Sequence, residues 1–479
     1  MISRLSNHMI RGFGFVAGTV VLALAGWFGI NATDENLSDE ARSLMAVPAP
    51  PAPSEKNGFL DFLVLGADEN APTYEIALSK LHALNNQRPT KDGLPVWDGF
   101  PGVRIDPRIP KCNPAESSCL KAAGKVPSLQ GLLENQRVFL QRYRAMRAKP
   151  EFANLQVQKL PFDETPGYGV IIDGQNLSLL KAAMQFNSGD YAGAIDELER
   201  ESAFHRRMAE GSINLIEKMI AVLALSKDVF FAAELARHIA PGETQLWPRL
   251  TMLTRPLTPD ELAIAPVLRR EMAFGMRYMQ TRRHVRLPDF MYEVAKDNPA
   301  DFDYIGSRPW WEWFKPYLYR PHQYVNDYAV NARLVLGVAA APSTEFLAAN
   351  RELPLKFDAM RPSWLAGVIL NPVGRNHYFS GYSFTSAYSS YVGRMHGIAG
   401  LYTLVHLQVA LRARGALTPE QVAEALSGPM GSAHLDPFAG KPMVFDAKTQ
   451  TIGFEALAKY FSGSIATQAE RQGRMAIPL

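Results

Sequence analysis

A long run without charged side chains near the start of the chain constrains the fold most. Residues 12–30 read GFGFVAGTVVLALAGWFGI. At 1.5 Å per residue, an apolar helix of this length crosses most of a ~30 Å hydrocarbon layer. We therefore predict a short tail at 1–11, a single transmembrane anchor at 12–30 that contacts inner-membrane lipid, and a large body outside the lipid.

The charges beside this run predict its orientation. Arg4 and Arg11 precede it, whereas the residues at 34–40 that follow it include Asp34, Glu35, Asp39 and Glu40. Positively charged flanks stay in the cytoplasm. The N-terminus is therefore expected to be cytoplasmic and the body periplasmic, in a single-pass protein of the inner membrane.

A cleaved signal peptide is the alternative. Ala23, Leu24 and Ala25 match the A-x-A pattern that precedes signal-peptide cleavage, so the chain could be cut after Ala25. Trp27 and Phe28 continue the apolar run beyond that point, and Trp is typical of a membrane interface. These residues favour the uncleaved anchor, although both alternatives export the body.

Composition divides the rest of the chain. Residues 31–56 contain AVPAPPAPS and are expected to form a Pro/Ala-rich stalk, because closely spaced prolines favour an extended chain. Residues 57–130 are rich in Pro, Gly, Asp and Asn and are expected to be loop-rich. Helical periodicity dominates at 131–435, and 436–479 should form a C-terminal hairpin and tail.

The fold class that follows is mainly α. The segment 177–200 indicates two helices around Ser-Gly-Asp, similar to one tetratricopeptide hairpin, although no second copy follows at the 34-residue period. Thr258-Pro-Asp-Glu and Thr418-Pro-Glu-Gln have the pattern of helix starts. A helix is expected from about 386 to 414, and the alternation at 442–454 predicts a β-hairpin.

Cys112 and Cys119 are the only cysteines of the chain. An even number of cysteines in an exported protein is typical of disulfide bonding. Metal and redox pairs usually have the tighter spacing C-x-x-C. We therefore predict one small structural disulfide loop, worth about 2.5 kcal/mol if it is unstrained.

Two pairs of residues are weak candidates for a metal site. Glu201 with His205, and Glu234 with His238, are each four positions apart and so lie on one face of a helix. Two such helices packed together could present all four side chains to one ion. Helical bundles that bind metals use Glu-x-x-His instead, and Glu and His at this spacing commonly form a surface hydrogen bond. No cofactor is predicted.

Glu201 followed by Ser202 also resembles the catalytic Glu-Ser of helical lytic transglycosylases, which makes Glu201 a weak candidate for a general acid. The Gly-Leu-Met-Gln signature of those enzymes is missing. The chain also lacks H-E-x-x-H, G-x-S-x-G, a P-loop and a dinucleotide fingerprint. A non-catalytic role is therefore favoured over a peptidoglycan hydrolase.

Aromatic residues provide the candidates for ligand or partner binding. The segment 301–328 is the densest in aromatic rings, and its prolines suggest an irregular surface segment that could present some of them outward. A second group follows glycine-punctuated residues 374–381 and could form a polar pocket at a helix N-terminus. In both places a packed core is the alternative. The candidates are Trp310, Trp311, Trp313, Tyr382, Tyr388, Tyr391, Arg394 and His396.

The nearly balanced charge gives no reason to expect binding to nucleic acid. Lys plus Arg number 50 and Asp plus Glu 47, which gives a formal charge of +3. The arginines at 137–147 alternate with apolar residues, as in an amphipathic helix with a solvated face. No nucleic-acid partner is predicted.

Four short segments carry a resemblance. LIEKMIA at 215–221, Tyr319-x-Pro321 running to Asn326, NPVGR at 371–375 and DPFAGKPM at 436–443 look like those of uncharacterised proteobacterial envelope proteins with one anchor. The resemblance covers roughly 132–454 and implies a helix-rich fold and an envelope location, with no catalytic residues. The function expected is a membrane-tethered scaffold that binds other envelope proteins and contacts the cell wall. A metal- or small-ligand-binding sensor is a further alternative.

Overall fold

The chain is described here from a computed structural model, which covers residues 2–69, 71–86, 104–157, 166–281, 315–360, 364–415, 418–455 and 474–479. Side chains at 2–14, 375–387 and a few other helical positions lie outside the description. The described chain is mainly helical, with a small antiparallel sheet near the C-terminus.

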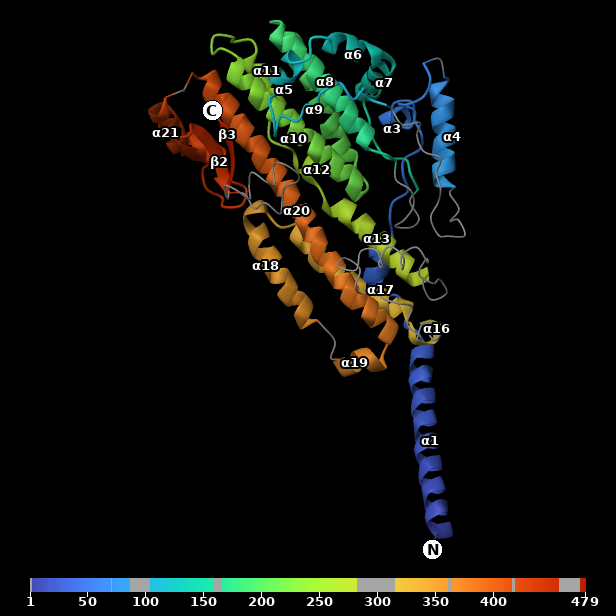
Figure 1. Cartoon of the computed structure of the whole chain (residues 1–479). Coiled ribbons are helices and arrows are strands. Elements are labelled where there is room, and N and C mark those ends of the chain that lie inside the picture. Colours follow the sequence, from blue (N-terminus) through green and yellow to red (C-terminus); the bar gives the residue numbers. More distant parts are fainter. Residues whose placement is uncertain are drawn as a thin grey trace.

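Helix α1 (Ile2–Ala32) projects from one end of the body (Figure 1). Its window Phe15–Ala32 has a mean hydropathy of 1.7 and is only 6% buried. Within the described residues it is the one helix long and apolar enough to cross a membrane. The described side chains at 15–26 are exposed, whereas Trp27 and Phe28 are half-buried where α1 meets the body.

The expected stalk at 31–56 lies partly against the body, and this differs from a free spacer. Helix α2 (Asp39–Met45) packs on α13 (Ala265–Thr281) and α17 (Pro321–Ala339), and it buries Ala41 and Leu44. Apolar burial and capping hold this part down, since Ser38 caps α2. The prolines at 48–53 run outside any helix or strand.

The region at 57–130, expected to be loop-rich, contains several short helices. Asn57 begins the first of them, because its side chain accepts a hydrogen bond from the amide of Phe59 and so caps the helix. The elements from here to residue 148 are α3 (Gly58–Phe62), α4 (Thr73–Asn85), α5 (Cys119–Gly124), α6 (Leu129–Asn135) and α7 (Arg137–Ala148).

Three long helices form the centre of the body: α8 (Gly169–Asn187), α9 (Tyr191–Gly211) and α10 (Leu215–His238). Gly189, with φ of 89°, turns the chain between α8 and α9, and Asp190 caps α9. The two helices pack along each other, and α9 also packs on α10. Helix α10 is apolar on most of its surface and is almost fully buried along its second half.

The longest helix of the described chain, α20 (Pro372–Ala413), runs along the body between α19 and the sheet (Figure 1). It starts earlier than expected, because the glycines at 374–381 lie inside it and Asn371 caps its first turn. The remaining helices are α11 (Trp247–Leu253), α12 (Pro259–Leu262), α16 (Lys315–Leu318), α18 (Ser343–Ala359), α19 (Trp364–Ile369), α21 (Pro419–Ser427) and α22 (Pro429–Ala433).

The C-terminal sheet has the order β1-β2-β3, with antiparallel neighbours. The expected hairpin is present as β1 (Val444–Asp446) and β2 (Thr451–Glu455), with a turn at Gln450. A third strand, β3 (Arg474–Pro478), pairs with β2 and was not predicted. The sheet packs on α20 through β2 and β3.

Candidate binding site

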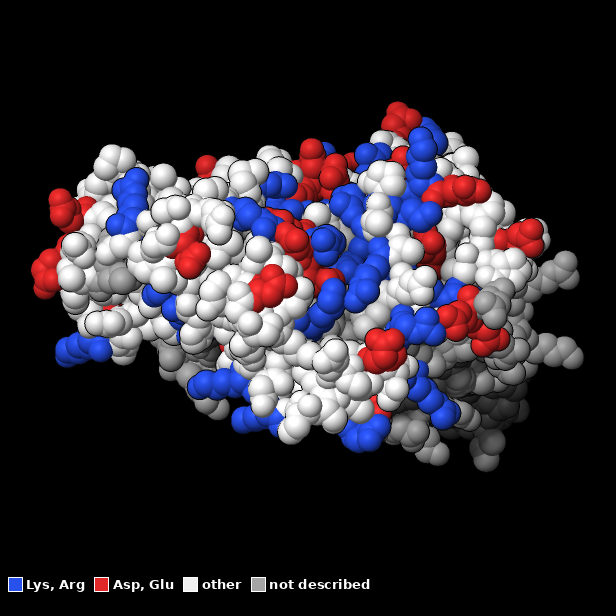
Figure 2. Space-filling view, turned by 90° about the horizontal axis from the view of Figure 1, so that it is seen from above, with Lys and Arg blue, Asp and Glu red and all other residues white. Residues whose placement is uncertain are grey.

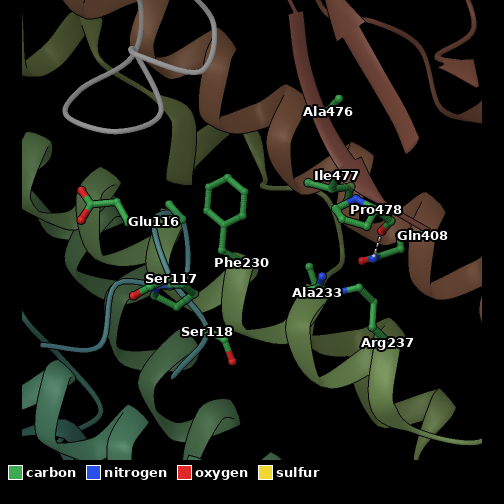
Figure 3. A pocket seen from close by; sticks show the side chains of 12 residues that line it. Glu116, Ser117, Ser118, Phe230, Ala233, Arg237, Gln408, Ala476, Ile477 and Pro478 are labelled. Atoms are coloured by element: carbon green, nitrogen blue, oxygen red, sulfur yellow. Dashed lines mark hydrogen bonds between the residues drawn. The ribbon is translucent and has the colours of Figure 1, made fainter. Parts of the chain in front are cut away.

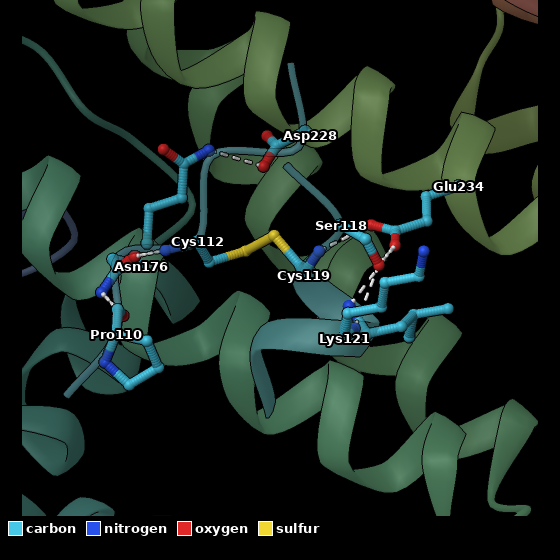
Figure 4. The surroundings of a disulfide bond; sticks show 10 residues. Pro110, Cys112, Ser118, Cys119, Lys121, Asn176, Asp228 and Glu234 are labelled. Carbon is cyan, nitrogen blue, oxygen red and sulfur yellow. Dashed lines mark hydrogen bonds between the residues drawn. A yellow bond between two sulfur atoms is a disulfide. The ribbon is translucent and has the colours of Figure 1, made fainter. Parts of the chain in front are cut away.

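Cys112 and Cys119 are joined in a disulfide that holds the loop 112–119 beside α8 and α10 (Figure 4). The carboxylate of Glu234 on α10 accepts hydrogen bonds from the hydroxyl of Ser118 and from the amides of Cys119 (3.0 Å) and Leu120 (3.4 Å). A carboxylate at these amides satisfies the first turn of α5 and suits its dipole. Glu234 is therefore occupied in fixing the disulfide loop to the core.

Glu201 takes part in a buried ion network at the crossing of α7, α8, α9 and α10. Its carboxylate lies 2.5 Å from Nη1 of Arg147 and accepts a hydrogen bond of 3.0 Å from the hydroxyl of Tyr143. Arg147 also binds Glu197 at 2.7 Å, and Glu197 accepts a further bond of 2.7 Å from Lys181. Arg147 and both carboxylates are at least 97% buried as side chains.

The same network continues to α10 through His205. Its Nδ1 lies 2.6 Å from Oδ2 of Asp228, and its Nε2 lies 3.7 Å from Glu201. Gln175 on α8 donates to Oδ1 of Asp228 at 2.7 Å. We call the set Arg147, Lys181, Glu197, Glu201, His205 and Asp228 the buried ion network. It connects four helices because each buried charge has an opposite charge or a polar partner.

The four residues proposed for a metal site have separate surroundings. Glu201 and His205 belong to the buried ion network, Glu234 caps α5, and His238 is exposed at the end of α10. In the described part of the chain, no three His, Cys, Asp or Glu side chains converge as a metal site would require.

The surroundings of Glu201 also bear on its role as a general acid. Burial raises the pKa of its carboxyl, and Arg147 opposes that shift. A general acid must reach the atom that it protonates, yet Glu201 is 0% exposed and enclosed by Arg147 and Tyr143. In this arrangement Glu201 stabilises the helix crossing.

The second aromatic group lies inside α20 and not at a helix N-terminus. Tyr388 is buried, the guanidinium of Arg394 lies 4.9 Å from the ring centre of Tyr391, and His396 packs on Phe346. Burial lowers the pKa of His396 to about 4, so the ring is neutral near pH 7. These four side chains belong to packing along the helix. The side chain of Tyr382, and Trp310, Trp311 and Trp313 altogether, lie outside the described residues.

An open cleft of ≈ 540 Å³ adjoins the buried ion network. It lies between α7, α8 and α9, within the size range of ligand sites. Five of its lining side chains are cationic, and Glu197 is the one carboxylate among them. We call it the basic cleft, lined by Arg144, Arg147, Ala148, Lys181, Glu197, Arg200, Ala203 and Arg207. Figure 2 shows, from above, Lys and Arg gathered in the middle of one face of the molecule.

The charges of the basic cleft are not balanced locally. Glu197 is already paired with Arg147 and Lys181. Arg200 lies 3.7 Å from Glu197 and 4.0 Å from Asp196, and its side chain is 60% exposed. Arg207 donates to a backbone carbonyl, and burial lowers its pKa. Arg144 is exposed and has no carboxylate partner among the described residues. The cleft therefore has donors and positive charge left for an anion.

A smaller cavity of ≈ 280 Å³ lies between the disulfide loop, α10, α20 and β3 (Figure 3). Phe230 and Ile477 supply apolar surface, whereas Glu116 and Arg237 provide one charge of each sign. Gln408 donates to the carbonyl of Pro478 at 2.6 Å, which fixes the end of β3 on α20. Because its lining is both apolar and polar and its two charges balance, this cavity favours no particular class of ligand. The basic cleft, in contrast, favours anions.

The basic cleft differs from the solvated helix face predicted for the arginines at 137–147. Arg147 is instead 4% exposed and binds two carboxylates of α9. The available signal was the spacing of Glu197, Glu201 and His205, which places three polar groups on one face of a helix that also packs on its neighbours. Their cationic partner, however, lies about fifty residues earlier.

Comparison with known proteins gives no further guide. No protein-family model matches the chain, and no curated protein or solved structure is significantly similar to it.

Proposed function

We propose that this chain is a single-pass membrane protein whose body binds an acidic segment of another envelope component in the basic cleft. The observation that carries the proposal is the lining itself, in which five cations face one carboxylate that is already paired. Opposite charge steers a partner to such a cleft and selects against basic partners. This role is that of a tethered scaffold and needs no reaction.

Rigidity of the walls supports the proposal. Arg147 and Lys181 are held by Glu197, while Arg144 and Arg200 extend into solvent at the rim. A partner therefore meets fixed charges at the base of the cleft and adjustable ones at its edge. Ordering fewer side chains on binding reduces the entropic cost of association.

The location belongs to the same proposal. With Arg4 and Arg11 on the cytoplasmic side of α1, the body stands in the periplasm, where other envelope proteins and the cell wall are its partners. The helices α8 and α9, similar to a tetratricopeptide hairpin, form two walls of the cleft. A reporter that fluoresces only in the cytoplasm, fused after Leu479, should stay dark. Bright cells would contradict this orientation.

Charge reversal tests the cleft. The double variant Arg144→Glu/Arg200→Glu replaces two exposed cations, and Arg351→Glu/Lys356→Glu makes the same charge change on the exposed face of α18. The full-length chain in detergent is titrated with a fluorescent Asp/Glu-rich peptide. We expect the first variant to bind about tenfold more weakly than wild type, equivalent to about 1.4 kcal/mol, with the control unchanged.

The proposal fails if both double variants bind the acidic peptide alike, since net charge alone then explains the attraction. It also fails if wild-type protein shows no salt-dependent binding. Cross-linking in intact cells, compared between wild type and Arg144→Glu/Arg200→Glu, then identifies the proteins whose contact depends on the cleft.

A further inference from the structure

The end of α1 is fastened to the body and not connected by a flexible joint. The indole Nε1 of Trp27 donates to the carbonyl of Ile369 at 3.1 Å, and the amide of Asn31 donates to the same carbonyl at 2.9 Å. The backbone amide of Asn371 donates to Asn31 at 2.7 Å. The ring of Phe28 packs edge-on against Tyr317 of α16, with centroids 6.5 Å apart.

The residues after Ala32 continue this attachment. Asp34 accepts hydrogen bonds from the amides of His322 (2.8 Å) and Gln323 (3.2 Å) and so caps α17. Asn326 on α17 bonds in turn with Glu35 and Asn36. Because α1 is one continuous helix, these contacts fix the height of the body relative to α1.

The length of α1 indicates how far this attachment lies from the cytoplasmic side of a bilayer. From Arg11 to Trp27 the helix rises about 24 Å, which is less than the ~30 Å of a hydrocarbon layer. Measured from Arg4 the rise is about 35 Å, still within the ~40–45 Å of a whole bilayer. If α1 spans the membrane, Trp27 and its neighbours lie at the lipid headgroups or below them.

Two apolar side chains of the body are exposed close to Trp27. Tyr317 on α16 is 59% exposed and Ile369 at the end of α19 is 39% exposed. Helix α19 reads WLAGVI and has no charged residue. Figure 1 shows α16 directly at the body end of α1, with α19 to one side of it. Tyr and Trp are typical of membrane interfaces, because one end of the ring is apolar and the other is polar.

The side-chain amides of Asn31 and Asn371 at this end are satisfied internally. Asn31 is 0% exposed and its amide and carbonyl bond to Trp27, Ile369 and Asn371. Asn371, at φ 51°, uses its side chain to bond both backbone groups of Arg320. Unsatisfied backbone or amide groups cost several kcal/mol in lipid.

We infer that the body itself contacts the bilayer through α16, α19 and the Trp27–Asn31 turn of α1, with Tyr317 and Ile369 at the boundary between headgroups and acyl chains. The inference rests on the proposed membrane anchor and adds a second, peripheral contact beside it. The partner is the lipid of the same membrane that α1 crosses. The body is consequently held against the membrane surface with a fixed orientation, and not raised on a stalk.

The test places an environment-sensitive fluorophore on single introduced cysteines of the full-length chain in phosphatidylethanolamine/phosphatidylglycerol vesicles. Tyr317→Cys and Ile369→Cys are the test positions, and Met252→Cys on α11, 67% exposed, is the control. We expect nitroxide lipids labelled near the headgroup to remove most of the emission at 317 and 369 and none at 252. Equal behaviour at all three positions overturns the inference.

A second measurement needs no substitution. Wild-type protein in the same vesicles is irradiated with a lipid-soluble diazirine and mapped by mass spectrometry. Label on α1, α16 and α19 supports the inference. Label on α1 alone leaves the anchor intact and overturns the contact of the body with lipid, whereas an unlabelled α1 overturns the anchor and the inference together.

Discussion

The crossing of α7 to α10 and the attachment of α1 to the body both bury polar groups among apolar side chains, but the two regions use different kinds of polar group. The crossing uses full charges, with Arg147 between Glu197 and Glu201. The part of the attachment made by α1 uses the neutral amides of Asn31 and Asn371, and carboxylates enter only after α1 ends, at Asp34 and Glu35. A charge near lipid has no water or cleft to relieve its desolvation, so neutral amides cost less there. The basic cleft gives the charged region a route to solvent.

The largest effect on the free energy of unfolding is expected at Arg147, which contacts two carboxylates of the buried ion network. Arg147→Met leaves Glu201 buried without its closest cation and leaves Glu197 with Lys181, and breaking a buried pair costs about 3–5 kcal/mol. Arg144→Met, on the same helix but exposed, should change the free energy of unfolding by less than about 0.5 kcal/mol. Urea unfolding of the two variants in detergent measures the difference. Equal free energies of unfolding for Arg147→Met and Arg144→Met would contradict the central role of Arg147 in the buried ion network.

A smaller effect is expected at the attachment of α1. Asn31→Leu leaves the buried amide of Asn371 without its acceptor, which costs about 1–3 kcal/mol. Hydrogen exchange at the first turn of α20 should accelerate accordingly. Thr19→Val, at an exposed position of α1 where the hydroxyl bonds only to its own helix, should leave exchange unchanged. Unchanged exchange in both variants would show that α1 is only loosely joined to the body.

Glu217 on α10 extends the comparison, because it is a buried carboxylate that forms no ion pair with an arginine in the described part of the chain. Burial raises its pKa to about 8 from a usual 4.5, against opposing hydrogen bonds from Ile213 and Asn154 and charges on Arg270 and Lys218. Folded protein then keeps a proton that the unfolded chain loses. The stability term from Glu217 is fully present below about pH 4.5 and lost as pH rises towards about 8.

Replacing Glu217 isolates this term. The wild-type free energy of unfolding should include a fall of about 1.4 kcal/mol per pH unit through the middle of that window, and Glu217→Gln should remove it. The exposed Glu210→Gln on α9 should keep the wild-type slope. Melting temperatures from pH 5 to 8 give the comparison, and parallel curves for wild type and Glu217→Gln would contradict the assigned protonation.

Local signals predicted much of the fold. The apolar run became α1, both Thr-Pro starts became capped helices with the bonds of a capping box, and 442–454 contains β1 and most of β2. Each depends on neighbours close in sequence, where periodicity and caps are informative. The mainly helical class follows from the same evidence.

Features that depend on distant partners were not predicted. The strand β3 follows β2 only after residues 456–473, so no turn signal joins them. The glycines at 374–381 indicate a loop by composition, yet α20 runs through them. Arg147 gave no sign of burial because its partners are on α9. The site was thus harder to predict than the fold, since a cleft arises from helices that the sequence separates.

The most direct measurement of the central claim is the intact mass and membrane retention of the chain after an alkaline wash of cell membranes. A body fastened to a membrane-spanning α1 predicts that the protein stays in the membrane fraction and retains the residues before Ala25. A soluble product that starts at Gly26 would contradict the membrane-spanning α1, because cleavage after Ala25 removes the anchor and leaves Trp27 and Asn31 away from the membrane.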